Sequence, residues 1–306
     1  MKRLSVWLVV LLLSGCVTHE LAPGVTPDKN AQIVQSASSG STQSYTGPET
    51  AYYLTEYYRN VSITMCRNNP SAPKFLCSGV MLRATQHSTI FHFWNPNPSS
   101  TGVSFSWLSA AAKFGSTAFS YPNGFIFSPY FFAFSGKIEP EILCFYPTDG
   151  ATTNRADKGC GASAWPNTAP CQSQGIYTAA QYKVHFQQNP QRYDHLCGFD
   201  VRDYLNEGAT DAFNEAVKAQ GELPPSAFGT QNEFRLEKWG QDQGAVLPII
   251  ALFYLNDTGK ANAQYDQRDF KTQNNIWLPM IRMTLPQNAT QDATFQYIPA
   301  DQAISS

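Results

Sequence analysis

Three hydrophobic patterns divide the sequence. An unbroken apolar run covers residues 6 to 13, behind Lys2 and Arg3. It is shorter than the roughly 20 apolar residues that span a bilayer. Residues 16 to 48 hold few large apolar side chains and are rich in Ser, Thr, Gly, Gln and Pro, which predicts a flexible tether. From 49 to 302, apolar positions recur at helical or alternating spacing, which predicts one folded domain.

Spacing within this domain predicts individual elements. Tyr52, Tyr53, Glu56 and Tyr57 lie at near-helical intervals, with Asn60 as a stop. The stretch 147–197 is polar and predicts irregular structure. Helices are predicted over 49–58 and 211–219, and strands over 75–85, 89–94, 103–107, 124–134, 141–146, 247–255 and 276–285, the last two crossed by a proline.

The start of the chain has the marks of an export signal. A basic start, a short apolar core and the small residues Ser14 and Gly15 precede Cys16. Leu13-Ser14-Gly15-Cys16 resembles the bacterial lipobox, which implies cleavage before Cys16 and a lipid on its sulfur. Residues 1–15 are then the signal peptide. Val17 in place of Asp favours the outer membrane, by likeness to sorted lipoproteins. The alternative is a plain signal peptide with an accidental cysteine.

Composition agrees with an exported globular protein. Charged residues make up 14% of the chain, below the roughly 25% of average domains. The net charge is −2, without a run of Lys or Arg, so no nucleic-acid partner is expected.

Six cysteines besides Cys16 form an even set, which in an oxidising compartment predicts disulfides. Cys66 with Cys77 is the one pairing suggested, because it closes a short loop; the others stay open. No C-x-x-C or H-x3-H spacing is present, so no metal is expected. The set is Cys66, Cys77, Cys144, Cys160, Cys171 and Cys197.

Common catalytic motifs are missing, among them the G-x-S-x-G elbow, the phosphate-binding loop and G-x-G-x-x-G. A dispersed set remains: Arg83, Ser104-Phe105-Ser106 and Glu139-Pro140-Glu141, each on or beside a predicted strand. In order and character this set resembles the Arg / Ser-x-Ser / Glu-x-Glu signature of mono-ADP-ribosyltransferases. Residues 77–85 and 197–203 also look like the halovibrins, secreted bacterial proteins of that type that split NAD.

The resemblance implies an α+β fold, with a mixed or antiparallel split sheet around a cleft and disulfides as staples. It implies NAD as substrate and no permanently bound cofactor. Arg83 would bind the diphosphate, since a planar guanidinium holds phosphate in a bidentate way. Glu141 would stabilise the cation-like ribose as the bond to nicotinamide breaks. Ser104 would orient Glu141, and Glu139 would assist an acceptor.

Aromatic side chains near these strands are candidates for stacking on the nicotinamide or adenine ring, and Ser106 is a further candidate for binding NAD. The aromatic candidates are Trp94, Phe105 and Tyr121.

Each piece has a plain alternative. Arg83 alone fits the polar position of a half-exposed strand, and the aromatic residues fit a core. Gln231-Asn232-Glu233 is a Gln-x-Glu variant of the third motif. If Glu233 is catalytic, residues 107–230 form an insertion. Glu141 is preferred because its spacing from Ser104 suits a compact domain. Gln220-Gly221-Glu222 also fits but precedes two prolines in an apparent loop.

These observations together predict a lipid-anchored envelope enzyme that hydrolyses NAD. ADP-ribosyl transfer to a host or competitor protein is the nearest variant. The alternative from another class is a non-catalytic envelope lipoprotein that binds a partner or scaffolds an assembly.

Overall fold

The structure is a computed structural model of the chain. It describes residues 46–59, 78–85, 102–127, 142–150, 160, 170–189, 197–202, 207–237 and 249–303. Predictions for Cys16, the tether up to residue 45 and the strand over 89–94 lie outside these residues.

In this part of the chain, nine strands form one mixed sheet in the order β5-β4-β6-β2-β1-β3-β7-β8-β9. All neighbouring strands are antiparallel except β7 and β8, which are parallel. The fold is therefore α+β with a mixed sheet. The strands are β1 (Val80–Ala84), β2 (Gly102–Leu108), β3 (Asn123–Phe127), β4 (Ile142–Tyr146), β5 (Phe199–Asp200), β6 (Glu233–Glu237), β7 (Ile249–Tyr254), β8 (Met280–Thr284) and β9 (Thr294–Tyr297).

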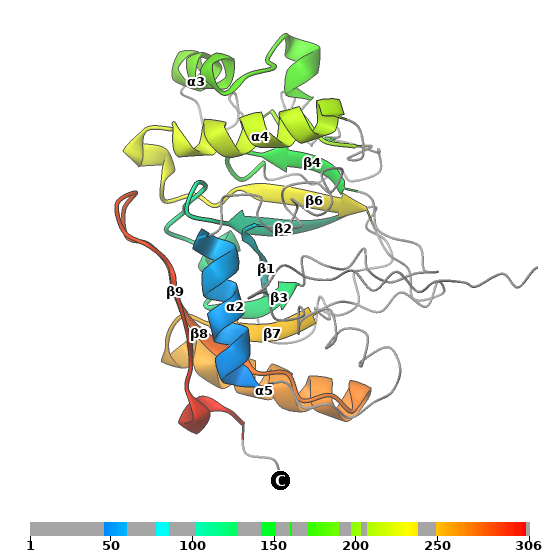
Figure 1. Cartoon of the computed structure of the whole chain (residues 1–306), viewed down its shortest axis with the longest axis vertical. Helices are drawn as coiled ribbons and strands as arrows, with labels where there is room; N and C mark the ends of the chain where they lie inside the picture. The colour runs from blue at the N-terminus through cyan, green and yellow to red at the C-terminus, as the bar shows by residue number, and fades with distance from the viewer. Residues whose placement is uncertain are drawn as a thin grey trace, which may run out of the picture.

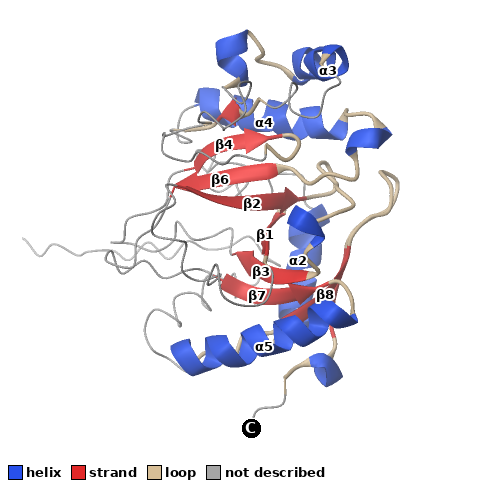
Figure 2. Ribbon diagram, turned by 180° about the vertical axis from the view of Figure 1, so that it is seen from behind, coloured by secondary structure: helices blue, strands red, loops and turns tan. Residues whose placement is uncertain are grey.

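Helices cover both faces of this sheet, with β2, β6 and β4 on one side of β1 and β3 and β7 on the other (Figures 1 and 2). Helix α2 packs against β9, β1 and β8 on one face. Helices α3, α4 and α5 contribute to the core on the opposite face. The helices are α2 (Gly47–Arg59), α3 (Ala179–Gln188), α4 (Glu207–Gly221) and α5 (Asp257–Asn274).

Alternation along the strands builds these two cores. Leu82 and Leu108 join the core beneath α2. Their neighbours Met81 and Trp107 join the core beneath the other three helices. Successive strand residues face opposite sides, so a strand covered on both faces is apolar at nearly every position. Burial of this kind is the main stabilising contribution, at roughly 25 cal/mol per Å² of apolar surface removed from water.

Six predicted strands and two predicted helices are confirmed in part or in full. The helix predicted over 49–58 is α2, and the one over 211–219 is the middle of α4. The strand predicted over 276–285 starts only at Met280, directly after Pro279. Proline has no N–H for a ladder bond, but its carbonyl still accepts a hydrogen bond from Leu252 N at 2.9 Å.

The prediction of irregular structure over 147–197 is wrong for α3. This helix buries only Ala179 and Tyr182, so it has no apolar stripe to reveal it. Local hydrogen bonds define its start: Thr178 and Gln181 form a capping box. Glu215 of α4 accepts a hydrogen bond from Ala179 N at 2.6 Å, placing a carboxylate at the positive end of the helix dipole.

Two disulfides are present among the described residues. Cys144–Cys160 and Cys171–Cys197 have Cα atoms 4.8 and 4.9 Å apart. The predicted disulfide frame is thus confirmed for four cysteines. The suggested Cys66–Cys77 pair lies outside the described residues and stays a prediction. Among the described residues, no helix is long and apolar enough to cross a membrane.

Candidate functional site

Strand β2 changes partners at the candidate site. It pairs with β1 from Leu108 to Ser106, and the described register ends at Leu82–Ser106. Further along, β2 pairs with β6 from Phe105 to Gly102. Strand β1 meanwhile continues beside β3 to Ala84. The sheet therefore separates between β1 and β2 at the position of Arg83 and Ser104.

Ser104 connects both sides of this separation. Its hydroxyl Oγ donates to Glu233 Oε1 at 2.5 Å, across 129 residues of sequence. Its carbonyl oxygen accepts from Arg83 Nη1 at 2.5 Å. By alternation, Arg83 belongs with Met81 on the face opposite to Ser104, and it reaches the carbonyl at the strand edge. Glu233 is buried, with 3% of its surface exposed.

Gln231 and Asn232 fix the start of β6. Ser106 Oγ donates to Gln231 Oε1 at 2.6 Å. The Asn232 side chain accepts from Trp107 N and donates to Trp107 O, both at 2.7 Å. It also donates to Gln220 Oε1 at 2.6 Å. Asn232 thus replaces a missing strand pairing and sets the position of the next residue, Glu233.

Tyr146, Arg235 and Cys144 lie on the same face of the sheet as Glu233. Tyr146 lies opposite Glu233 in the β4–β6 register, and Arg235 lies opposite both Ser104 and Cys144. Residues directly opposite in an antiparallel pair project to one face. Phe105 and Trp107 belong to the core on the opposite face, so Ser104 and Ser106, which alternate with them, lie on the α2 face of the sheet. Helix α2 itself covers other strands of that face.

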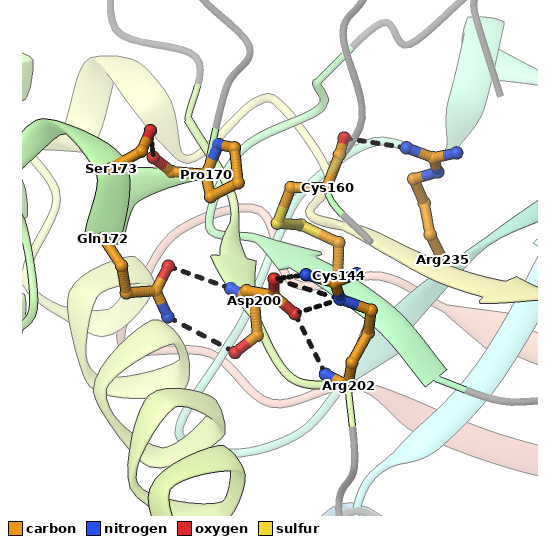
Figure 3. Close-up of polar contacts among 8 residues, drawn as sticks. All are labelled: Cys144, Cys160, Pro170, Gln172, Ser173, Asp200, Arg202 and Arg235. Atoms are coloured by element: carbon orange, nitrogen blue, oxygen red, sulfur yellow. Dashed lines mark hydrogen bonds and ion pairs between the residues drawn. A yellow bond between two sulfur atoms is a disulfide. The ribbon is translucent and has the colours of Figure 1, made fainter. Parts of the chain in front are cut away.

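The Cys144–Cys160 disulfide brings a carbonyl group to this face. Cys160 O accepts hydrogen bonds from Arg235 Nη1 at 2.8 Å and from Tyr146 Oη. Figure 3 shows the disulfide beside Arg235, with one guanidinium nitrogen turned to Cys160 and the others turned away from it. Near them, Gln172 bonds the backbone of Asp200 at the β5 edge of the sheet.

Gly150 leaves room for the glutamate. A Cβ atom at this position would lie 2.9 Å from Glu233 Oε2 and 2.9 Å from a ring carbon of Tyr146. Any side chain larger than hydrogen would therefore press on the carboxylate.

The structure brings together Arg83, Ser104, Ser106 and Glu233 of the predicted set. Glu139, Glu141 and Trp94 lie outside the described residues, so the preference for Glu141 stays a prediction. Phe105 is 2% exposed on the opposite face, in ring contact with Phe125 and Phe127. That contact gives Phe105 a packing role, and the geometry offers no support for stacking on a ligand.

Two local interpretations of the sequence are wrong. Residues 107–230 are not an inserted loop, because they include β3, β4 and α4. Gln220 is not in a loop, because it lies in the last turn of α4, where its side chain holds Asn232. Tyr121 contacts the exposed ring of Phe119.

Four residues around the site were not predicted from the sequence: Asn232, Tyr146, Gly150 and Arg235. Arg235 resembles an ordinary polar position in an alternating strand, and only the fold shows that it is fully buried. Asn232 stands inside the Gln-x-Glu motif, so its polar side chain before a strand was the one available signal.

The described residues contain no group of three or more His, Cys, Asp or Glu side chains placed to hold a metal ion. A comparison with models of known families finds no match, and a search of curated proteins finds no similar sequence.

Proposed function

We propose that this protein cleaves the bond between nicotinamide and ribose in NAD, with Glu233 as the catalytic carboxylate. The observation that carries the proposal is the hydrogen bond from Ser104 Oγ to Glu233 Oε1, on a serine whose carbonyl holds Arg83. Ser104 thus contacts both the arginine and the glutamate of the Arg / Ser-x-Ser / Gln-x-Glu pattern. An ADP-ribosyltransferase-like fold is part of the proposal.

The residue types suit the reaction. The C1′–N bond breaks with its electron pair leaving on nicotinamide, and C1′ gains positive charge. A buried carboxylate stabilises that charge more strongly than one in water. Water then attacks C1′ and releases a proton, giving ADP-ribose and nicotinamide. Ser104 fixes one carboxylate oxygen, so Glu233 needs little rearrangement as charge develops.

Water is the acceptor that this geometry favours over a protein. In the transferase family the first residue of the third motif assists the acceptor. Here that residue is Gln231, which is buried and accepts a hydrogen bond from Ser106. A Gln231 side chain already engaged in the sheet is poorly placed to receive a large acceptor. Hydrolysis is therefore proposed ahead of transfer to protein.

We also propose an envelope location, through a lipid on Cys16. This rests on the lipobox-like sequence at 13–16. The two disulfides support an oxidising compartment.

The test is nicotinamide release from NAD by the full chain, expressed with its own export signal and purified in detergent. Glu233→Gln keeps the shape of the side chain and removes its charge. We expect its kcat to fall by roughly 100-fold or more, as for loss of one group that stabilises transition-state charge. Glu222→Gln, in the unused Gln-x-Glu sequence at the end of α4, is the matched control and should keep full activity.

Glu141→Gln separates the two assignments. If Glu141→Gln abolishes activity and Glu233→Gln does not, Glu141 is the catalytic residue. If the wild type releases no nicotinamide, the enzyme proposal fails and a binding or scaffolding lipoprotein becomes the better account. Labelled NAD with cell extract distinguishes hydrolysis, which leaves no labelled protein, from transfer.

A further inference from the structure

Arg235 is a fully buried cation with an unfilled hydrogen-bonding edge. Its side chain has 0% exposure, and Nη1 donates to Cys160 O at 2.8 Å. Among the residues that the structure describes, neither Nε nor Nη2 has a hydrogen-bond acceptor, whether carboxylate or carbonyl. Burying a charge without compensation is costly, and Cys160 O is a neutral partner. The described residues therefore leave two of the three guanidinium nitrogens without a hydrogen-bond acceptor.

The unfilled donors have the geometry of an anion site. Nε–H and Nη2–H lie on one edge of the planar guanidinium, where they match two oxygens of a phosphate or carboxylate. Cys160 holds the third nitrogen and fixes the plane, so the free edge is preorganised. Figure 3 shows this edge pointing away from the Cys160 carbonyl.

Arg235 is also near the proposed catalytic group. It stands two residues after Glu233 on β6 and opposite Ser104 on β2, so all three side chains share one face. Cα atoms two apart on a strand are separated by about 6.6 Å. One ribose 5′-phosphate can contact both positions, with its ribose at Glu233 and its phosphate at Arg235.

Arg83 is differently placed. By alternation it starts from the opposite face, and its Nη1 is used on the Ser104 carbonyl. This contact positions β2 where the two strands separate.

We infer that the Nε/Nη2 edge of Arg235 binds an anionic phosphate group of the substrate, beside Glu233. The inference rests on the proposed function for the identity of the phosphate, which is the one on the nicotinamide ribose.

The experiment measures pyrophosphate binding and thermal unfolding of the full chain in detergent, as wild type, Arg235→Met and Arg235→Lys. Wild type should bind pyrophosphate and unfold at a higher temperature with it. Arg235→Met should weaken binding at least tenfold, and Arg235→Lys should lie between, since Lys keeps charge without the planar fork. Arg202→Met, at an exposed guanidinium paired with Asp200, is the matched control and should bind like wild type.

The unfolding temperature without ligand separates a binding role from a structural one. Methionine in place of a buried cation with two unfilled donors should leave the temperature unchanged or raise it. A fall of more than about 5 °C would assign the guanidinium to the fold and overturn the inference. Unchanged pyrophosphate binding in Arg235→Met, or no binding by the wild type, would overturn it too.

NAD kinetics keep this inference apart from the proposed function. Arg235→Met should raise KM for NAD at least tenfold, with a smaller change in kcat. Arg235-dependent pyrophosphate binding without NAD cleavage would sink the proposed function and leave the anion site standing. NAD cleavage with an unchanged KM in Arg235→Met would overturn the anion site and leave the proposed function standing.

Discussion

Single residues at the start of β6 decide where the glutamate lies. The Asn232 side chain accepts a hydrogen bond from Trp107 N and donates one to Trp107 O. These bonds hold the chain to β2 just before the backbone pairing of β6 begins. A buried polar group that loses its partner costs about 1–3 kcal/mol, which makes this position sensitive to substitution. Glu233 follows directly, and its carboxylate position is therefore set by backbone contacts as well as by Ser104.

Gly150 provides a test of this geometry in which no charged or polar residue is substituted. Gly150→Ala should push Glu233 Oε2, because the new Cβ would lie 2.9 Å from it. A small displacement of a catalytic group can reduce rate by up to about 100-fold. We therefore expect kcat for NAD cleavage to fall roughly 10- to 100-fold with the protein still folded, measured by nicotinamide release and circular dichroism.

Gly229→Ala is the control, since a Cβ there meets nothing within 4 Å. Equal activity of Gly150→Ala and wild type would show that the position of Glu233 Oε2 does not matter for turnover.

Sequence could predict the residue types of the site but not the choice of glutamate. The motif predicted Arg83, Ser104 and Ser106 in that order, but it gave Glu233 only as the alternative to Glu141. Ser104 meets Glu233 because β2 pairs with β6, across 129 residues. The pairing of strands this far apart in sequence depends on contacts throughout the sheet, so the spacing of motifs along the chain says little about it.

At the scale of elements, strands were easier to predict than polar helices. Short, strongly apolar stretches marked β1, β2 and β7, because both cores take apolar side chains from these strands. Helix α5 gave no such signal. Its buried positions include Asp266 and Gln267 beside Ala263 and Phe270, so it docks partly through polar contacts that hydrophobic periodicity cannot reveal.

The docking of α5 should depend on pH through Asp266. Burial chiefly, and then the charge of Asp269, raises the pKa of this carboxyl to about 7 from 3.8. Asn123 Nδ2 on β3 donates to Asp266 at 3.2 Å and opposes the shift. Between pH 4 and 7 this carboxyl thus binds more protons in the folded protein than in the unfolded chain, so its contribution lowers the free energy of unfolding as pH rises.

Asp266→Asn should remove this dependence. Asparagine resembles the protonated acid and cannot ionise, so the variant should match wild type at pH 4 and exceed it at pH 8 by a few kcal/mol, on the order of the shift. Urea unfolding at each pH measures this. Asp211→Asn, at an exposed residue of α4, should keep the wild-type slope. A wild-type slope in Asp266→Asn would assign the pH dependence to other groups.

At the scale of the whole molecule, covalent links join segments that are distant in sequence around the proposed site. The Cys144–Cys160 disulfide attaches to β4 the residue whose carbonyl holds Arg235 and Tyr146. The Cys171–Cys197 disulfide instead joins the segment before α3 to the start of β5. Both disulfides link segments near the β4–β5 edge of the sheet. Only the first brings an atom, the Cys160 carbonyl oxygen, to the face on which Glu233 lies.

The two disulfides should therefore differ in their effect on function. In the chain-entropy model, loops of 16 and 26 residues give about 3 and 3.5 kcal/mol of stability. We expect the double variants Cys144→Ser/Cys160→Ser (the 144/160 variant) and Cys171→Ser/Cys197→Ser (the 171/197 variant) to lower the free energy of unfolding by similar amounts. Below their unfolding temperatures, however, the 144/160 variant should lose NAD affinity at least tenfold, because Arg235 and Tyr146 lose their common acceptor.

The 171/197 variant acts as the matched control, because it loses comparable stability and should keep a KM near that of wild type. Nicotinamide release at several NAD concentrations, beside urea unfolding of both variants, provides the measurement. Equal KM values in the two variants would mean that the Cys160 carbonyl does not organise the anion site. In that case the first disulfide contributes stability alone, and the orientation of Arg235 must come from elsewhere.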